Sequence, residues 1–326
     1  MKIFFLTHEV TPLAAVNSTV LDNTRKALLA HYDIEEVTDP ELADALIIRE
    51  EVNFKNFRYI KTLQSDPIIS KHLAKVFTIN FDDCATGLLK GLYSNIPKSR
   101  LDPRHHLAVP YAEYFNELVF NTKSSPVKKP KYLASWRGNL RSNKIRPTLL
   151  KYFRSMSDCL VEFSESWLNH PIEEKSNYIS LMLDAKFSLC PAGWAPSSFR
   201  IYESMALGRC PVIIADDFTP PKGPNWNDFA LFFPQNKLKD LHHFLKEHES
   251  SADEMGSKAK EAWENHFSAA ILPDYYADSL IKLIKTSGVG TNEAELQRWN
   301  SLKFRWSNKW TLPQRVTAKM EKLNIM

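Results

Sequence analysis

Short apolar runs alternate with amphipathic segments along the first third of the chain. The runs have the length and composition of buried strands, whereas the segments between them carry apolar residues at helical spacing. The strand patterns are 2–6, 33–37, the second half of 39–50, and 75–81; the helical patterns are 18–32 and, broken in the middle, 57–73. Strands that alternate with helices predict a parallel, doubly wound sheet.

A polar, basic segment with two prolines, 121–131, interrupts this alternation and is typical of a linker. A second alternating series follows it. Its strand patterns are 132–138, 159–163, 186–191, 210–214 and 229–234, and its helical patterns are 143–156, 172–185, 198–207 and 237–248. The sequence therefore predicts two Rossmann-like domains, 1–125 and 126–290, followed by a helical tail, 291–326. Ligands of such sheets bind beyond the carboxyl ends of the strands.

Composition narrows the class of protein. The chain has 326 residues, 44% hydrophobic and 25% charged, with a net charge of +4, which fits a globular protein and is too weak a charge to indicate nucleic-acid binding. Its four cysteines form no CxxC pair, which disfavours a zinc site and a thioredoxin-like motif and favours reduced thiols in the cytoplasm. The opening "MKIFFLTHEV" is too short for a signal-peptide core or a membrane helix.

The stretch 186–214, "KFSLCPAGWAPSSFRIYESMALGRCPVII", holds the most specific chemistry. Ser197 or Ser198 is a good N-cap for a short helix that ends at Gly208. A helix start after a strand suits a pyrophosphate, onto which Arg200 would fork, while Glu203 would accept from ribose hydroxyls. The alternative is a surface Arg200–Glu203 pair of about 0.3 kcal/mol. Against it, an arginine in the first turn opposes the helix dipole unless an anion compensates.

Several residues of this stretch occur in the order found in one enzyme family. They are Cys190-Pro191, Gly193, Ser198, Arg200, Glu203, Gly208, Pro211-Val212 and Asp216. On these residues the chain resembles the exostosin-type glycosyltransferases, glycosyltransferase family 47. Segments 132–153 and 216–233 extend the likeness, and 76–87 is a weaker match in which Asp83 takes the aspartate position and Asp82 the histidine position. The resemblance covers about 75–233.

The resemblance implies a GT-B fold of the α/β class, with two Rossmann-like domains facing across a cleft and a sugar nucleotide held by the second. It also implies transfer with inversion and without a metal or other cofactor. A start directly in the first strand suggests a bacterial soluble form that builds surface polysaccharide or lipopolysaccharide. UDP is preferred over GDP on the resemblance alone.

The donor site expected from these arguments is built around Arg200, because without a metal the leaving diphosphate needs arginines and helix N–H groups. The other expected donor residues are Ser197, Ser198, Glu203, Pro191, Gly193, Trp194, Arg137, Gly138 and Arg146. Arg137 and Arg146 are alternatively solvated arginines, and Trp194 alternatively a packing aromatic. Gly138 would allow the backbone to approach the donor.

The general base should come from the first domain. Asp83 ends a predicted strand next to Asp82, and paired carboxylates raise one another's pKa. The alternative for this pair is a turn cap. His8, with Glu9 in the first strand-to-helix loop, is the second choice, and there a capping or acceptor-contact role is equally open.

Other polar clusters in the sequence are weaker candidates for a functional site. Asp216-Asp217 is a weak metal signal and is interpreted as part of the fold or donor side. The histidine pairs 105–106 and 242–243 have no third ligand nearby in sequence and are expected at the surface. No metal site is expected.

The tail alternates Trp299, Trp306 and Trp310 with Lys303, Arg305 and Lys309. One interpretation is a peripheral membrane patch at the inner face of the membrane, for a lipid-linked acceptor. The preferred interpretation is a helix that packs back on the N-terminal domain.

Two alternatives to an active enzyme of this family stay open. One is a catalytically inactive GT-B protein that binds a glycan or a partner enzyme. The other is a different GT-B class, such as a fucosyltransferase with a GDP donor. The expected partners of an active enzyme are a nucleotide-sugar and an oligosaccharide or lipid-linked glycan, and the sequence does not settle the sugar, the acceptor or the oligomeric state.

Overall fold

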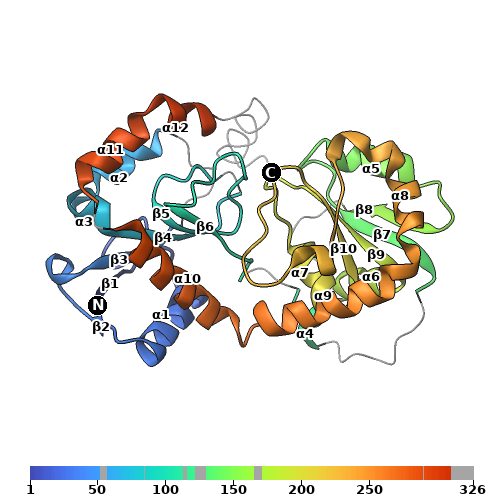
Figure 1. Ribbon diagram of the computed structural model, residues 1–326, viewed down its shortest axis with the longest axis horizontal. Coiled ribbons are helices and arrows are strands. Elements are labelled where there is room, and N and C mark those ends of the chain that lie inside the picture. Colours follow the sequence, from blue (N-terminus) through green and yellow to red (C-terminus); the bar gives the residue numbers. More distant parts are fainter. Residues whose placement is uncertain are drawn as a thin grey trace. The chain divides into compact units, whose positions relative to one another are not determined.

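The structure is a computed structural model that describes residues 1–51, 57–83, 85–112, 116–121, 130–164, 171–288 and 290–309. The chain forms two compact units, the first made of Met1–Val109 and Pro273–Met326 and the second of Pro110–Leu272. The expected boundaries were 125/126 and 290/291, whereas the contacts divide the chain at 109/110 and 272/273. Figure 1 shows each unit with its own sheet.

The first unit is built on a six-stranded sheet in the order β2-β1-β3-β4-β5-β6, with every neighbouring pair parallel. Its strands are β1 (Lys2–Leu6), β2 (Glu35–Glu36), β3 (Ala45–Arg49), β4 (Val76–Asn80), β5 (Lys90–Tyr93) and β6 (His106–Ala108). Its helices are α1 (Thr19–His31), α2 (Tyr59–Ser65), α3 (Pro67–His72), α10 (Leu272–Ser287), α11 (Asn292–Asn300) and α12 (Leu302–Ser307), with short 3-10 turns at Pro40–Leu42 and Leu73–Lys75.

The helices α11 and α12 of the tail contribute to the core of the first unit. Trp299 and Phe304 are buried in one hydrophobic cluster with residues of β1, β3 and β4 and of α2 and α3. The Trp299 indole N–H donates to the Leu88 carbonyl at 2.7 Å, and Arg298 donates to the Gly87 carbonyl at 3.1 Å. Trp310 lies outside the described residues.

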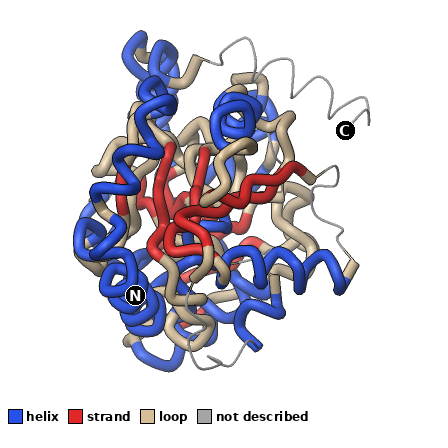
Figure 2. The backbone as a smooth tube through the Cα atoms, turned by 90° about the vertical axis from the view of Figure 1, so that its right-hand side faces the viewer, coloured by secondary structure: helices blue, strands red, loops and turns tan. Residues whose placement is uncertain are grey.

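The second unit is built on a five-stranded parallel sheet in the order β11-β10-β9-β7-β8. Its strands are β7 (Tyr132–Gly138), β8 (Cys159–Phe163), β9 (Ala185–Pro191), β10 (Cys210–Ile214) and β11 (Leu231–Phe232). Its helices are α4 (Glu117–Asn121), α5 (Ile145–Phe153), α6 (Ile172–Leu183), α7 (Phe199–Ala206), α8 (Leu241–Glu247) and α9 (Ala252–His266), with 3-10 turns at Trp226–Asp228, Gln235–Asp240 and Glu249–Ser251. Figure 2 shows the strands inside and the helices around them.

The predicted fold class, α/β with two parallel Rossmann-like sheets and a helical C-terminal extension, is confirmed. Two strands, β5 and β6, were missed, and the run 229–234 pairs only over Leu231–Phe232. The expected linker 121–131 lies largely outside the described residues.

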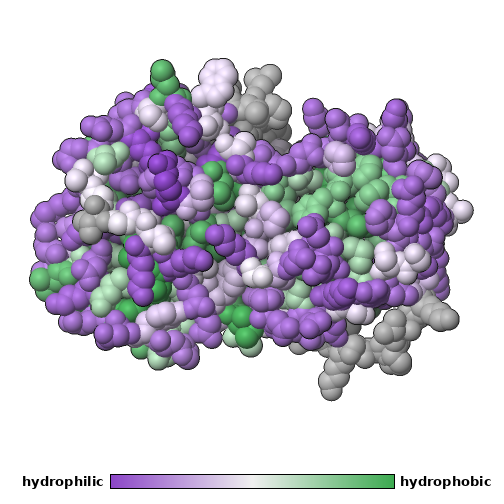
Figure 3. Space-filling model, viewed as in Figure 1, coloured by the Kyte–Doolittle hydropathy of each residue, from purple (hydrophilic) through white to green (hydrophobic). Residues whose placement is uncertain are grey.

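The visible surface of the protein is mostly polar. Hydrophilic side chains dominate the visible face of Figure 3, and a hydrophobic area lies over the strands of the second unit. Among the described residues, no helix combines the length and the apolar character needed to span a bilayer.

Candidate functional site

The helix α7 begins immediately after the loop that follows β9, as the pattern of 186–214 predicts. Its N-cap residue is Ser198, in an extended conformation, and its C-cap is Leu207. Gly208 follows with φ +67°, a left-handed conformation that glycine adopts without strain. The helix start therefore lies at the carboxyl end of a parallel sheet, where Rossmann-like folds bind ligands.

Arg200 and Glu203 are both buried, with 7% and 5% of their surface exposed. The alternative of a solvent-exposed ion pair on the helix surface is therefore wrong. The Arg200 guanidinium lies over the Tyr178 ring, 4.7 Å from its centroid, and its Nη2 donates to the Arg137 carbonyl. The Nη1 of Arg200 is buried with no hydrogen-bond partner among the described residues. Because a buried charged donor is costly without an acceptor, a water or a ligand oxygen must supply one.

Glu203 is held by the protein on both carboxylate oxygens. Its Oε2 accepts from the Tyr178 hydroxyl at 2.5 Å, and its Oε1 accepts from the Asn116 backbone N–H at 3.4 Å. Burial raises the pKa of Glu203, and the Tyr178 hydroxyl, the Arg200 charge and the Asn116 N–H act in the opposite direction. The long bond to Asn116 leaves Oε1 the better placed of the two oxygens to accept from another donor.

Two buried serine hydroxyls lie beside the loop that precedes α7. Ser198 is the N-cap residue, as predicted, but its hydroxyl makes no capping hydrogen bond. The Ser197 Oγ is buried and has no partner among the described residues, and the same is true of the Ser142 Oγ. Ser142 lies beside Gly193, with its Oγ 3.9 Å from the place where a Cβ would stand. Sequence reasoning missed Ser142, for which "NLRSNK" gives no signal beyond a polar turn.

Arg146 connects two loops at this end of the sheet. Its Nε donates to the Ala192 carbonyl and its Nη1 to the Asn139 carbonyl, both at 3.0 Å. The neighbouring Asn143 donates to the Gly193 carbonyl at 3.0 Å. A Cβ on Gly193 would lie 2.9 Å from the Arg146 Nη2, so a side chain at this position would displace the guanidinium from its present place. The interpretation of Arg146 as a solvated arginine is therefore wrong.

Arg137 and Gly138 end β7 on the same side of the sheet. Arg137 is half-buried and lies 3.9 Å from Glu162 and 3.8 Å from Glu174. A Cβ on Gly138 would lie 3.0 Å from the Trp136 ring, so the absent side chain has a packing reason whether or not a donor approaches. Pro191 ends β9 and is buried, and Trp194 is half-buried in the loop.

The base candidates all lie in the first unit. Asp82 is buried, and its backbone N–H donates to the Asn80 side chain at 3.0 Å. Asp83 is half-buried and accepts from the Asn95 amide at 3.2 Å. His8 is exposed, and its Nδ1 lies 3.0 Å from the Ala14 carbonyl oxygen. A carbonyl only accepts, so Nδ1 carries the proton and Nε2 of the neutral ring keeps its lone pair.

A further carboxylate, Glu50, was missed by sequence reasoning. It follows β3 directly, is buried, and accepts from the Thr78 hydroxyl at 2.6 Å and from the Asn80 amide at 2.9 Å. Its charge adds to burial in raising the pKa of the Tyr59 hydroxyl. Glu50 and Asp82 thus follow neighbouring parallel strands, a placement that "IIREE" could have suggested.

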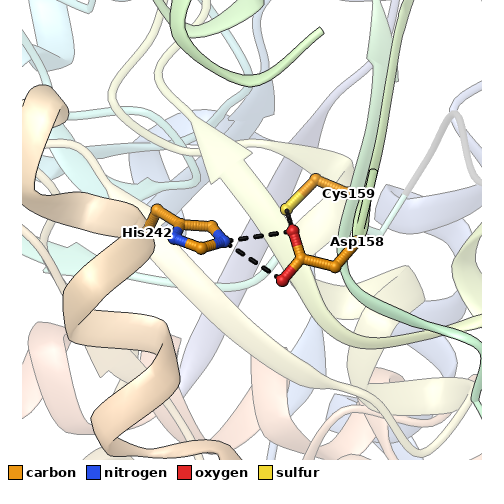
Figure 4. A group of neighbouring side chains, drawn as sticks. All are labelled: Asp158, Cys159 and His242. Atoms are coloured by element: carbon orange, nitrogen blue, oxygen red, sulfur yellow. Dashed lines mark hydrogen bonds and ion pairs between the residues drawn. The ribbon is translucent and has the colours of Figure 1, made fainter. Parts of the chain in front are cut away.

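The expectation that both histidine pairs lie at the surface holds only for His243, because His106 is buried and His105 and His242 are half-buried. His106 is buried, donates from Nε2 to the Gly87 carbonyl at 3.0 Å, and accepts at Nδ1 from the Asp102 N–H. His242 is half-buried and lies 3.1 Å from the Asp158 carboxylate, next to Cys159. Figure 4 shows these last three side chains together.

The two parallel sheets, each flanked by helices, place the chain in the class of two-unit Rossmann-like proteins. A buried arginine, Arg200, lies at a helix start beyond the second sheet. The Exostosin GT47 domain family model matches residues 79–248, which is more than half of the chain. The protein belongs to this family, and the resemblance found in its motifs is confirmed.

Curated relatives carry glycosyltransferase names. The chain is 37% identical over 111 residues to the probable glucuronosyltransferase Os03g0107900 of Oryza sativa subsp. japonica, a match that covers 33% of this chain and 24% of that protein. It is 34% identical over 88 residues to the probable beta-1,4-xylosyltransferase IRX10 of Arabidopsis thaliana, covering 25% of this chain and 21% of that protein. It is 32% identical over 114 residues to ribitol-5-phosphate xylosyltransferase 1 of Danio rerio, covering 33% and 26%.

The chain therefore spans about a quarter of the length of these relatives. Among solved structures, Acinetobacter baumannii MurG aligns over 82% of this chain and 78% of that chain, with 11% identity and a TM-score of 0.33.

Proposed function

We propose that the protein is an inverting glycosyltransferase that moves a sugar from a nucleotide-sugar, with a UDP-sugar preferred, to a glycan or glycolipid acceptor in surface polysaccharide synthesis. Membership of the Exostosin GT47 family and the glycosyltransferase names of the relatives support this activity. The observation that supports binding of the donor most directly is the buried Arg200, whose Nη1 has no protein acceptor among the described residues.

The donor diphosphate is proposed to bind at the start of α7. There the positive end of the helix dipole favours an anion, and Arg200 adds a full positive charge. The buried hydroxyls of Ser197 and Ser142 lack partners in the described part of the chain and would donate to phosphate oxygens. As the bond to the sugar breaks, negative charge grows on the diphosphate, and these fixed donors stabilise it without a metal.

The acceptor hydroxyl needs a base, and three residues of the first unit are proposed for it: Asp83, Asp82 and His8. Asp82 is buried, which leaves Asp83 and His8 as the more accessible candidates. His8 combines exposure with a fixed tautomer, because the Ala14 carbonyl holds the Nδ1 proton and leaves Nε2 to accept one.

A lipid-linked acceptor and a peripheral membrane contact are proposed from α12. Leu302 and Trp306 are 87% and 80% exposed, and Lys303 and Arg305 are exposed beside them. Apolar and basic side chains together suit an anionic lipid surface. The cytoplasmic location stays a prediction of the cysteine content.

The activity is tested by release of UDP or GDP from a panel of nucleotide-sugars, with and without oligosaccharide acceptors, in EDTA. We expect acceptor-dependent release with one UDP-sugar, lost by at least about a hundredfold in the variant that lacks the base. The variants are Asp83→Asn, Asp82→Asn and His8→Gln, with the exposed His31→Gln as the control. Glycan binding without turnover of any donor would instead favour the catalytically inactive alternative.

A further inference from the structure

Asp158, Cys159 and His242 form a cluster at the end of the second sheet opposite the proposed donor site. Cys159 begins β8 and pairs with Ala134 of β7, whereas Gly138, at the donor end of β7, pairs with Phe163. Asp158 precedes the strand, and His242 lies in the first turn of α8. Figure 4 shows the imidazole pointing at the Asp158 carboxylate and the Cys159 thiol beside one of the carboxylate oxygens.

The three donor atoms have the spacing of a metal site. The His242 Nε2 lies 3.1 Å from each carboxylate oxygen of Asp158, and the Cys159 Sγ lies 3.6 Å from Oδ1. One donor atom from each residue lies within 4.8 Å of the other two. Around a tetrahedral zinc ion, with bonds of about 2.0 to 2.3 Å, ligand atoms stand roughly 3.3 to 3.6 Å apart. Only small side-chain shifts separate the cluster from that geometry.

We propose that Asp158, Cys159 and His242 bind a zinc-class divalent cation, with water at the fourth position. One sulfur, one imidazole nitrogen and one carboxylate oxygen form a donor set that zinc favours and that magnesium and calcium do not. The imidazole is positioned for this role, because its ring packs edge-on against the buried Phe153 at 6.4 Å. Asp158 and His242 are partly exposed, which gives the ion a route in.

Lys246 is the group that opposes the metal. Its Nζ lies 2.9 Å from Asp158 Oδ2 and 3.3 Å from Glu249, so the cluster without metal is an ordinary ion-pair network. The ammonium occupies Oδ2 and leaves Oδ1 beside the thiol and the imidazole. A cation at Oδ1 would be repelled by the nearby ammonium charge, so Lys246 sets the affinity without being a ligand.

The bound ion would connect the start of β8 to α8 within one unit. Since the cluster and the start of α7 lie at opposite ends of the parallel strands, the ion would act on the stability of this unit and take no part in sugar transfer. The proposal is therefore independent of the proposed function, and it agrees with transfer that needs no metal.

The test is calorimetric titration of Zn²⁺ into the full chain after chelator treatment and dialysis, with Co²⁺ absorption spectra in parallel. We expect one equivalent of Zn²⁺ and a thiolate-to-cobalt charge-transfer band. Cys159→Ser and His242→Gln should each weaken binding at least about tenfold and, for the serine variant, remove the band. Lys246→Gln should tighten binding by about tenfold, because it removes the repelling charge.

The chain offers matched controls for two of the three ligands, His242 and Cys159. His243 is the exposed neighbour of His242, and Cys210 is a buried free thiol away from the cluster. His243→Gln and Cys210→Ser should bind like the wild type. The proposal is overturned if Cys159→Ser and His242→Gln bind Zn²⁺ as the wild type does, or if His243→Gln loses as much affinity as His242→Gln. Circular dichroism of each metal-free variant separates loss of a ligand from loss of folding.

Discussion

At the residue scale, Tyr178 allows two charged side chains, Arg200 and Glu203, to be buried at the proposed donor site. Its ring lies under the Arg200 guanidinium and its hydroxyl donates to Glu203, so one side chain from α6 supports both charges. The sequence pattern placed Arg200 and Glu203 on one helix, but it could not show their burial, because Tyr178 comes from another element, 22 residues before Arg200.

Removal of the Tyr178 hydroxyl tests this arrangement. Tyr178→Phe keeps the ring under Arg200 and leaves Glu203 with the long bond to Asn116, which should lower the free energy of unfolding by about 1 to 3 kcal/mol. Because the hydroxyl lowers the pKa of Glu203, its loss raises that pKa further above the ordinary 4.5. A raised carboxyl pKa costs stability as the pH rises through it. Urea unfolding should therefore show a larger loss at pH 7 than at pH 4, and a loss independent of pH would contradict this role.

At the element scale, α7 is held against α9 by two glycines. Gly208 ends α7 in a left-handed conformation, and a Cβ on Gly256 of α9 would lie 2.5 Å from the Gly208 carbonyl oxygen. The helix end at Gly208 was predictable from the sequence, whereas the close approach of Gly256 was not, because an isolated glycine in a helical pattern indicates only a local cost. The position of α7 thus depends on a contact with an element some fifty residues later.

Gly256→Ala tests whether the close contact with α7 outweighs the cost of a glycine inside a helix. Alanine favours the helix by roughly 1 kcal/mol, yet its Cβ meets backbone that must move. We expect a net loss of about 1 to 3 kcal/mol in the free energy of unfolding and weaker nucleotide binding, measured by thermal denaturation and calorimetry. Ser257→Ala, at the exposed next position of α9, should change neither. Stabilisation by Gly256→Ala would show that α7 and α9 do not pack this closely.

The strand β5 was missed from the sequence for a physical reason. In β5 the pattern is broken by Lys90, which is buried and bonded to the Ala74 carbonyl, and by Gly91, where a Cβ would collide with the backbone of Thr78. A lysine and a glycine within four residues are typical of a turn, so the local sequence does not predict a strand. The strand is stabilised by tertiary contacts that the local sequence does not show. It pairs with β4, and Glu295 of the tail helix α11 lies 3.8 Å from the lysine.

At the scale of the whole molecule, the alternation of elements was enough to predict two parallel sheets. The alternation could not predict the strand order within each sheet or the return of the chain to the first unit at Pro273, because a linear pattern does not show which elements meet. The tail was predicted to pack on the N-terminal domain, and Trp299 does lie in the core of the first unit.

The buried His106 makes the first unit sensitive to acid. Burial lowers the pKa of His106 to about 3, and the charges of Arg298 and His105 act in the same direction. The unfolded chain takes up this proton near pH 6.5 and the folded chain does not, so stability is lost as the pH falls below about 6.5. His106→Gln should flatten this fall between pH 6.5 and about 4, measured by urea unfolding at each pH, while the exposed His243→Gln should leave it unchanged. An equally steep fall in His106→Gln would rule out this histidine as the cause.

The most direct test of the central claim, a nucleotide diphosphate held at the start of α7 by Arg200, is calorimetric titration of UDP and GDP in EDTA into the wild type, Arg200→Ala and the surface control Arg154→Ala. The account predicts that the wild type and Arg154→Ala bind one nucleotide, UDP rather than GDP, and that Arg200→Ala binds it at least about tenfold more weakly. Equal binding by Arg200→Ala and the wild type would contradict the account, and so would no binding of either nucleotide by the wild type.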